Sequence, residues 1–302
     1  MDDGSLGEKR WTLLELLNWT AARFKRVGID EARLNAELLL GKVTGLERIM
    51  LYARFDQEPT ASQLDELREL VRRRASRHPL QYLLGRCEFY GRDFEVTPAV
   101  LVPRQETELV VDKCLEKIGG DGSGTLAADV GTGSGIIAVT LACERPGLRV
   151  AATDSSPDAL ALARCNAARH GVADRVEFAC GDLCEALPAG MREGLALIAS
   201  NPPYVPSAQI AGLQPEVREH EPRAALDGGP DGLDVVRRLL PEAAEALGEG
   251  GWLVVELGED QAPVVRRLIE DRGLGLAAES VETVRDGCGC ERVLAVRRAA
   301  LA

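Results

Sequence analysis

A glycine-rich segment in the middle of the chain has the composition of a loop that binds a nucleotide-like cofactor. Asp129-Val130-Gly131-Thr132-Gly133-Ser134-Gly135 ends an apolar run and precedes a stretch, residues 136–143, that we expect to be helical. Glycines let the backbone pass close to a ligand, and the first amides of a helix are free to donate to it. Such loops also occur as turns without ligands, so this segment alone does not define a site.

Acidic residues follow the next two strand-like runs. Asp154 ends the first of these, 23 residues after Gly131, where a carboxylate can accept hydrogen bonds from both ribose hydroxyls of an adenosine. It could also cap a helix that starts near Pro157, and the two roles can coexist. Gly181-Asp182-Leu183 ends the second run and would place a carboxylate and backbone amides beside an adenine ring.

The most specific motif, Ser200-Asn201-Pro202-Pro203-Tyr204, follows the fourth run. A planar amide or amine nitrogen is a poor nucleophile because its lone pair is delocalised. The Asn201 side-chain oxygen and the Pro202 carbonyl can accept the two N–H bonds of such a group and align its nitrogen, while the prolines keep these acceptors rigid. Tyr204 offers an apolar face to the planar substrate group. The motif therefore predicts methyl transfer from S-adenosylmethionine to a planar nitrogen, with Asn201, Pro202 and Tyr204 as catalytic residues and Pro203 as a further substrate contact.

Short apolar runs alternate with helical stretches beyond Pro103, at residues 126–130, 149–153, 176–180, 196–199 and 252–257. This alternation predicts an α/β fold, a mostly parallel sheet with helices on both faces and ligands at the carboxyl ends of the strands. Two later segments, 277–285 and 292–296, would form an antiparallel hairpin at one edge, around Gly287. Such an edge is common on the Rossmann-like sheet of class I methyltransferases.

The first 85 residues have a helical pattern. Thr12 with Glu15 and Thr60 with Gln63 have the spacing of capping boxes, and Asp30 is expected to cap a helix between them. We predict a small helical domain over residues 1–85. A linking hairpin over 86–104 would turn at Gly91-Arg92, and the catalytic domain would span 105–302.

Composition limits the classes of partner. The formal net charge of -12 opposes binding to a polyanion, so a DNA substrate is disfavoured. The basic cluster Arg72-Arg73-Arg74 with Arg77 is expected to be a solvated helix face. Eight cysteines without metal-site spacing predict reduced thiols and no metal. No apolar run approaches the roughly 20 residues of a membrane helix, so we expect a cytoplasmic protein without a membrane partner.

The sequence resembles the HemK/PrmC-type glutamine N5-methyltransferases, which modify the GGQ motif of peptide-chain release factors. The resemblance spans nearly the whole chain. Besides the Asn-Pro-Pro-Tyr loop, it rests on these segments: His78-Pro79-Leu80-Gln81-Tyr82 with Gly85, Glu88-Phe89-Tyr90-Gly91, Leu101-Val102-Pro103-Arg104-Gln105-Glu106-Thr107-Glu108, Glu221-Pro222-Arg223-Ala224-Ala225-Leu226, and Arg285-Asp286 with Glu291-Arg292.

This resemblance implies a class I methyltransferase domain that receives the substrate glutamine, preceded by a helical domain that recognises the release factor. It implies a site for S-adenosylmethionine formed by Gly131, Thr132, Gly133, Ser134, Gly135, Asp154, Asp182, Leu183 and Asn201. We also expect the protein to be a monomer. Many relatives have Trp where this chain has Leu183, so an aromatic contact to the adenine is lost here.

Three alternatives remain open from the sequence. A ribosomal-protein glutamine methyltransferase shares the Asn-Pro-Pro-Tyr loop, but that group usually has a Ser-Pro-Ile type segment in place of Gln105-Glu106-Thr107-Glu108. An adenine-N6 DNA methyltransferase would act on a similar planar N–H pair, but it needs base flipping and a basic groove. A non-catalytic protein on the same fold need not keep Gly131, Asp154 and Asn201 together.

Overall fold

The computed structural model describes residues 10–272 and 274–299, which form two compact units. The first unit comprises the residues up to Gly85 together with the distant segment Pro215–His220, and the second comprises Arg86–Gln214 and the residues from Glu221 onward. In the described residues, no helix has the length and apolar character needed to cross a membrane.

The first unit is helical, with α1 (Leu13–Arg26), α2 (Ala32–Thr44), α3 (Arg48–Ala53), α4 (Ala61–Ala75) and α5 (Leu80–Leu84). Both predicted capping boxes are confirmed at Thr12 and Thr60. The predicted cap at Asp30 is wrong, because Glu31 adopts a left-handed conformation at the start of α2 and no side chain caps this helix. The Asp30 carbonyl instead accepts a hydrogen bond from Asn35.

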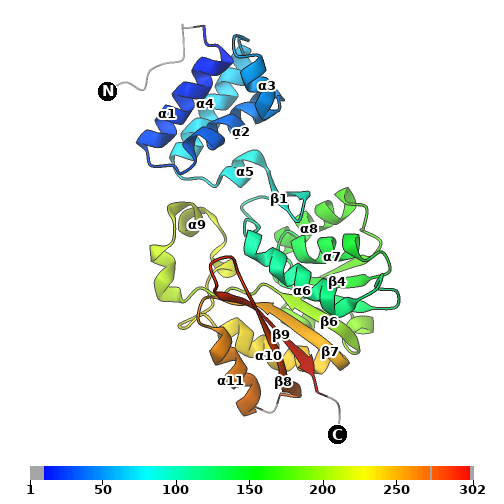
Figure 1. Cartoon of the computed structure of the whole chain (residues 1–302). Coiled ribbons are helices and arrows are strands. Elements are labelled where there is room, and N and C mark those ends of the chain that lie inside the picture. The colour runs from blue at the N-terminus through cyan, green and yellow to red at the C-terminus, as the bar shows by residue number, and fades with distance from the viewer. Residues whose placement is uncertain (1–9, 273, 300–302) are drawn as a thin grey trace. The chain divides into compact units, whose positions relative to one another are not determined.

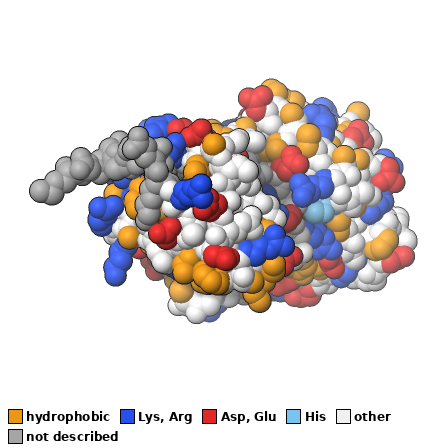
Figure 2. All heavy atoms as spheres, turned by 90° about the horizontal axis from the view of Figure 1, so that it is seen from above, with side chains coloured by type: hydrophobic (Ala, Val, Ile, Leu, Met, Phe, Trp, Pro, Cys, Tyr) orange, Lys and Arg blue, Asp and Glu red, His pale blue; other side chains and the backbone are white. Residues whose placement is uncertain are grey.

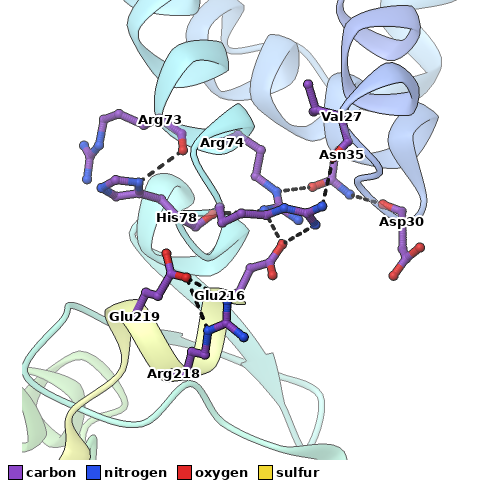
Figure 3. Close-up of polar contacts among 10 residues, drawn as sticks. Val27, Asp30, Asn35, Arg73, Arg74, His78, Glu216, Arg218 and Glu219 are labelled. Carbon is purple, nitrogen blue, oxygen red and sulfur yellow. Dashed lines mark hydrogen bonds and ion pairs between the residues drawn. The ribbon is translucent and has the colours of Figure 1, made fainter. Parts of the chain in front are cut away.

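The helix α9 (Pro215–His220) is the distant segment that belongs to the first unit (Figure 3). Arg74 on α4 donates to Glu216 at 2.9 Å and to Asn35 at 2.7 Å. Its side chain is only 9% exposed, so the predicted solvated face is wrong for Arg74. The prediction holds for Arg72, which is exposed and pairs with Glu69 on its own helix. The rings of His78 and His220 also pack together, with centroids 4.1 Å apart.

The second unit begins with a two-stranded hairpin, β1 (Arg86–Phe89) and β2 (Arg92–Glu95). Its turn lies at Tyr90-Gly91, one residue earlier than predicted, and both of these residues have positive φ. This conformation suits the twist of a two-residue hairpin.

A seven-stranded sheet forms the rest of the second unit, in the order β5-β4-β3-β6-β7-β9-β8. The pairings among β3 to β7 are parallel, whereas β9 is antiparallel to both β7 and β8, which confirms the predicted α/β fold and its edge hairpin. The strands are β3 (Leu126–Val130), β4 (Arg149–Asp154), β5 (Val176–Cys180), β6 (Leu195–Ser200), β7 (Leu247–Glu256), β8 (Leu276–Arg285) and β9 (Glu291–Arg298).

Helices cover both faces of this sheet (Figure 1). They are α6 (Glu108–Ile118), α7 (Ile136–Glu144), α8 (Pro157–Arg169), α10 (Asp234–Ala246) and α11 (Ala262–Arg272). Strand residues alternate between two buried clusters: Ala127 and Val254 pack with α6, α7 and α8, whereas Ala128 and Leu253 pack with α10 and α11. Successive side chains of a strand point to opposite faces of the sheet, so burial on both faces fixes the strand register. Because β3 to β7 are parallel, their carboxyl ends lie at the same edge of the sheet.

Candidate active site

A cavity of about 340 Å³ opens at the carboxyl ends of β3, β4, β5 and β6. This is the edge at which a doubly wound sheet binds ligands, beside the point where the strand order reverses. It brings together nine of the residues predicted from sequence: Gly131, Thr132, Gly133, Ser134, Asp154, Asp182, Leu183, Asn201 and Pro203. Gly135, Pro202 and Tyr204 were also predicted but are not among the residues that line it.

The glycine-rich loop is held open by backbone geometry and by a buried acid. Gly131 and Gly133 have φ values of 76° and 55°, a region that residues with a Cβ rarely adopt. Beneath the loop, the fully buried Asp129 accepts hydrogen bonds from the Thr132 hydroxyl at 2.6 Å and from the Ala138 amide at 3.0 Å. Burial raises the pKa of Asp129 to about 6. The loop therefore presents bare backbone to the cavity.

Asp154 joins the ends of two neighbouring loops. Its carboxylate accepts from the Gly133 amide and from the Ser156 amide, both at 2.9 Å. The alternative role as a cap of α8 is wrong, because the Ser156 hydroxyl caps that helix by accepting from the Ala159 amide. Asp154 remains partly exposed in the cavity lining, where its carboxylate can also accept hydrogen bonds from a ligand.

The loop after β5 supplies the opposite wall. Asp182 forms an ion pair with Arg238, and both side chains are about half exposed. Leu183 has a positive φ of 41°, and its carbonyl accepts from the Thr153 hydroxyl at 3.2 Å. This hydrogen bond fixes the backbone of the loop. Leu183 lacks the aromatic ring of the Trp found in many relatives, so the loop offers the adenine its backbone.

Asn201 is oriented by a hydrogen bond to a residue outside its own loop. Its Nδ2 donates to the hydroxyl of Thr107, at the end of a short 3-10 turn (Gln105–Thr107), at 3.0 Å. Ser200, just before it, anchors the end of β6 by donating to the Val130 carbonyl at 2.7 Å. The side chain of Asn201 is half-buried and lines the cavity.

A buried carboxyl lies behind this asparagine. Glu256, at the end of β7, is fully buried, and its Oε2 accepts from the Thr107 hydroxyl at 2.7 Å. Burial raises the pKa of Glu256 to about 7. Burial and the nearby Glu256 carboxyl also raise the pKa of Tyr204 well above its ordinary value. Tyr204 therefore lies against the buried Glu256 carboxyl.

The backbone of the Asn-Pro-Pro-Tyr loop is held by residues far along the chain. The Tyr204 carbonyl accepts from Gln261 Nε2 at 3.0 Å, and Val205 exchanges backbone hydrogen bonds with Leu226 and Gly228, each at 2.9 Å. A Cβ at Gly228 would come within 2.6 Å of the Pro203 carbonyl, so only glycine allows this approach. These contacts hold the Asn-Pro-Pro-Tyr loop rigid in addition to its two prolines.

Glu221 fixes the segment that forms another side of the cavity. Its carboxylate accepts from Arg104 at 2.7 Å and from the Val102 amide at 3.2 Å. Its side chain is only 2% exposed, and burial raises its pKa even though Arg104 acts in the opposite direction. Arg104 and Pro222 both line the cavity.

Sequence reasoning missed the structural roles of Thr107, Glu256 and Glu221. Thr107 and Glu221 lie inside segments that resemble a known family, but the resemblance gave neither residue a role of its own. Glu256 had one signal of its own, since it is an acidic residue at the end of the apolar run Trp252–Val255. A carboxylate in such a position is costly unless it has a partner or a function.

Together, the doubly wound sheet, the glycine loop after β3, the acidic loop ends after β4 and β5 and the Asn-Pro-Pro-Tyr loop after β6 define a class I S-adenosylmethionine-dependent methyltransferase. The residues present fit this cofactor: bare glycine backbone can lie against its amino-acid part, Asp154 can accept from its ribose, and the backbone of the β5 loop can contact its adenine.

Known proteins identify the family. The PrmC N-terminal domain matches residues 15–85, and the methyltransferase small domain matches residues 107–214. A release factor glutamine methyltransferase of Geobacter sulfurreducens is 46% identical over 287 residues, which cover 95% of this chain and 97% of that protein. A protein of the same description from Moorella thermoacetica is 45% identical over 288 residues, which cover 95% and 99%.

This chain therefore belongs to the release factor glutamine methyltransferase family, and the resemblance found from sequence is confirmed. Among solved structures, a methyltransferase from Pyrococcus furiosus matches with a TM-score of 0.50 and 20% identity, covering 70% of this chain and 91% of that one. This likeness supports the fold alone.

Proposed function

We propose that this protein transfers the methyl group of S-adenosylmethionine to the side-chain amide nitrogen of the glutamine in the GGQ motif of peptide-chain release factors. The observation that carries the proposal is the position of Asn201, whose side chain shares one cavity with the glycine loop and Asp154. Its Nδ2 donates to Thr107 and its Oδ1 accepts no hydrogen bond from the described residues, so Oδ1 can accept from a substrate amide. The names of the close relatives support the choice of release factors.

The residues of the loop act by orientation and by fixed dipoles. When bound, the cofactor supplies an electrophilic methyl group on a sulfonium. Asn201 Oδ1 and the Pro202 carbonyl accept the two N–H bonds of the glutamine amide, and this aims its nitrogen along one direction. Positive charge grows on that nitrogen during transfer, so these acceptors stabilise the transition state more than the ground state. Pro203 lines the cavity, whereas Tyr204 does not and lies against the buried Glu256, so Tyr204 would support the loop from behind and not pack on the substrate group. After transfer, the nitrogen loses a proton to water or a neighbouring group.

The helical unit is proposed to recognise the body of the release factor. It contains none of the residues that line the cavity. Its composition also differs from that of the rest of the chain: residues 1–85 hold 14 Lys and Arg and 13 Asp and Glu, whereas the remaining residues hold 22 and 35. The helical unit is thus close to neutral and the rest of the chain is strongly acidic, so the two units offer different surfaces to a partner.

The proposal also covers the oligomeric state, the cellular location and the absence of DNA modification. We propose a monomer that acts in the cytoplasm, where translation supplies its substrate, and that does not modify DNA. The net charge of -12 supports the last of these points, and on the face drawn in Figure 2 acidic and basic side chains are interspersed.

Transfer of label from S-adenosylmethionine tests the proposed function directly. The purified protein is incubated with the labelled cofactor and, separately, with a release factor, a ribosomal protein preparation and DNA. We expect label only in the release factor, and a variant of that factor with the GGQ glutamine changed to alanine should remain unlabelled. Label in DNA or in a ribosomal protein alone would refute the proposal.

Removal of the helical unit tests its role. A chain that starts near Cys87 should keep cofactor binding but lose methylation of the intact release factor, while it still methylates a short peptide that contains GGQ. The segment Pro215–His220 loses its partners in this truncation, so Glu216→Ala in the full chain is the matched control. Full activity of the truncated enzyme on the intact factor would show that the unit does not recognise the substrate.

A further inference from the structure

We propose that Thr107 and Glu256 are positioning residues that fix which way the Asn201 side-chain amide points, so that its oxygen and not its nitrogen faces the substrate. This inference rests on the proposed function, because it concerns the same amide. It assigns to two buried residues a role that the Asn-Pro-Pro-Tyr loop cannot perform by itself.

The three residues form one chain of hydrogen bonds behind the cavity. Asn201 Nδ2 lies 3.0 Å from Thr107 Oγ1, and Thr107 Oγ1 lies 2.7 Å from Glu256 Oε2. Thr107 and Glu256 are both fully buried. Ser200 is paired with Val255 in the parallel ladder of β6 and β7, so Asn201 and Glu256 leave adjacent strands at the same level.

The direction of these bonds follows from the number of protons. An asparagine amide has a donor end and an acceptor end of nearly equal size, so shape alone does not select its orientation. A threonine hydroxyl has a single proton. An ionised Glu256 can only accept, so it takes that proton from Thr107. Thr107 Oγ1 can then only accept from Asn201, which turns the amide nitrogen toward Thr107 and the oxygen toward the cavity.

Protonation of Glu256 removes this constraint. The protonated carboxyl can donate to Thr107, whose own proton is then free to point at Asn201. The asparagine would then present its oxygen to Thr107 and its two N–H bonds to the substrate, where they would oppose the N–H bonds of the glutamine amide. The protonation state of one buried carboxyl therefore selects between a productive and an unproductive Asn201.

The surroundings of Glu256 place this equilibrium in an accessible range of pH. Burial raises its pKa to about 7, with Glu106 acting in the same direction, whereas the Thr107 hydroxyl, Tyr204 and Arg292 favour the ionised form. Its Oε1 has no hydrogen-bond partner of standard geometry among the described residues, although the Tyr204 hydroxyl lies close enough to lower the pKa. The charged form is thus held mainly through Thr107.

Substitution of Thr107 gives the first test. Thr107→Val has the same shape without the hydroxyl, and Thr107→Ser keeps the hydroxyl without the methyl group. We expect Thr107→Val to lower kcat by about 10- to 100-fold, because Asn201 loses its hydrogen bond and its orientation. The KM for the release factor and the affinity for S-adenosylmethionine, measured by calorimetry, should change by less than about 3-fold. Thr107→Ser should keep kcat within about 3-fold of the parent.

A double substitution separates positioning from general stability. In an Asn201→Ala background there is no amide to orient, so adding Thr107→Val should lower the residual rate by less than about 2-fold. An equal loss in both backgrounds would overturn the proposal, and so would a parental kcat for Thr107→Val or a Thr107→Ser variant as slow as Thr107→Val. The parent enzyme must label the release factor in the same assay. If it does not, the proposed function fails and the positioning of Asn201 is judged by neutron diffraction of the parent and of Thr107→Val, which distinguishes Oδ1 from Nδ2; the same amide orientation in both would refute it.

The pH profile tests Glu256. In the parent, kcat should rise about 10-fold between pH 6 and pH 8 as Glu256 ionises, because the glutamine amide does not titrate in this range. Glu256→Gln is close in shape and cannot titrate, so its profile should be flat. A Glu256→Gln variant that keeps the inflection of the parent would show that another group controls the rate and would overturn the role of Glu256.

Discussion

Replacing Asn201 with alanine isolates the contribution of one acceptor to the proposed transfer. The substitution should have little effect on folding. Among the described residues, the only side-chain hydrogen bond of Asn201 is the one to Thr107, and Thr107 keeps its bond to Glu256 when it is lost. A single such bond contributes about 1 kcal/mol, against a typical stability of about 5 to 15 kcal/mol.

The effect on the rate should be much larger. In the proposed mechanism, Oδ1 is one of two acceptors whose hydrogen bonds strengthen as positive charge develops on the substrate nitrogen, and loss of one preorganised polar contact of this kind costs about 3 to 4 kcal/mol of transition-state stabilisation. Turnover should therefore drop by roughly 100-fold or more, while cofactor affinity stays within a few-fold of the parent. Single-turnover label transfer to a release factor and calorimetry with S-adenosylmethionine measure the two quantities separately. Asn201→Ala with the parental rate at saturating substrate would refute the orientation mechanism even if the enzyme class is right.

Three further predictions concern the cofactor site and the helical unit. Asp154→Ala should weaken cofactor binding by about 1.5 to 3 kcal/mol in calorimetry, because charge-assisted hydrogen bonds are lost; unchanged affinity in a folded variant would remove Asp154 from the site. Arg74→Ala should destabilise the helical unit by about 2 kcal/mol in thermal unfolding, since the buried Asn35 loses this partner and Glu216 keeps only its contact with Arg77 at 3.3 Å, whereas the exposed Arg72→Ala should change stability by less than about 1 kcal/mol. Burial and the neighbouring His220 lower the pKa of His78 below its ordinary 6.5, so the unfolded chain binds more protons and the helical unit should lose stability as pH falls below about 6.5. His78→Gln should weaken that loss, and an identical pH dependence would contradict this assignment.

The sequence predicted much of the cavity lining because each predicted segment directly follows an apolar run. In an α/β sheet each strand ends at the same edge, so a motif that follows an apolar run is located by the run itself. The glycine loop, Asp154, Asp182 and Asn201 could all be placed in this way. The predicted sheet followed from the same alternation of strands and helices, whereas the edge hairpin was predicted from two β-like segments joined by a turn at Gly287.

What the sequence could not reveal depends on contacts between distant residues. Thr107 and Asn201 are 94 residues apart, Thr107 and Glu256 are 149 apart, and Arg74 and Glu216 are 142 apart. No local pattern signals such a pair, because periodicity records only which face of an element is buried. The arginine cluster shows the consequence: its helical spacing is that of a solvated face, yet Arg74 is buried by α9.

Asn201→Asp asks the sharper question of whether the donor end of the asparagine matters as much as its acceptor end. Aspartate keeps an acceptor of the same size for the substrate but offers a second carboxylate oxygen to Thr107, where Asn201 offers Nδ2. Thr107 has one proton, so it can satisfy either this new carboxylate or Glu256, and two negative groups then share one hydroxyl. We expect one of the two acids to take up a proton at neutral pH, which should shift the pH profile of kcat upward relative to the parent. The negative charge beside the sulfonium should keep or tighten cofactor binding, while kcat falls strongly but not to the level of Asn201→Ala. An Asn201→Asp variant with the parental rate and pH profile would show that the Thr107 side of the amide has no part in catalysis.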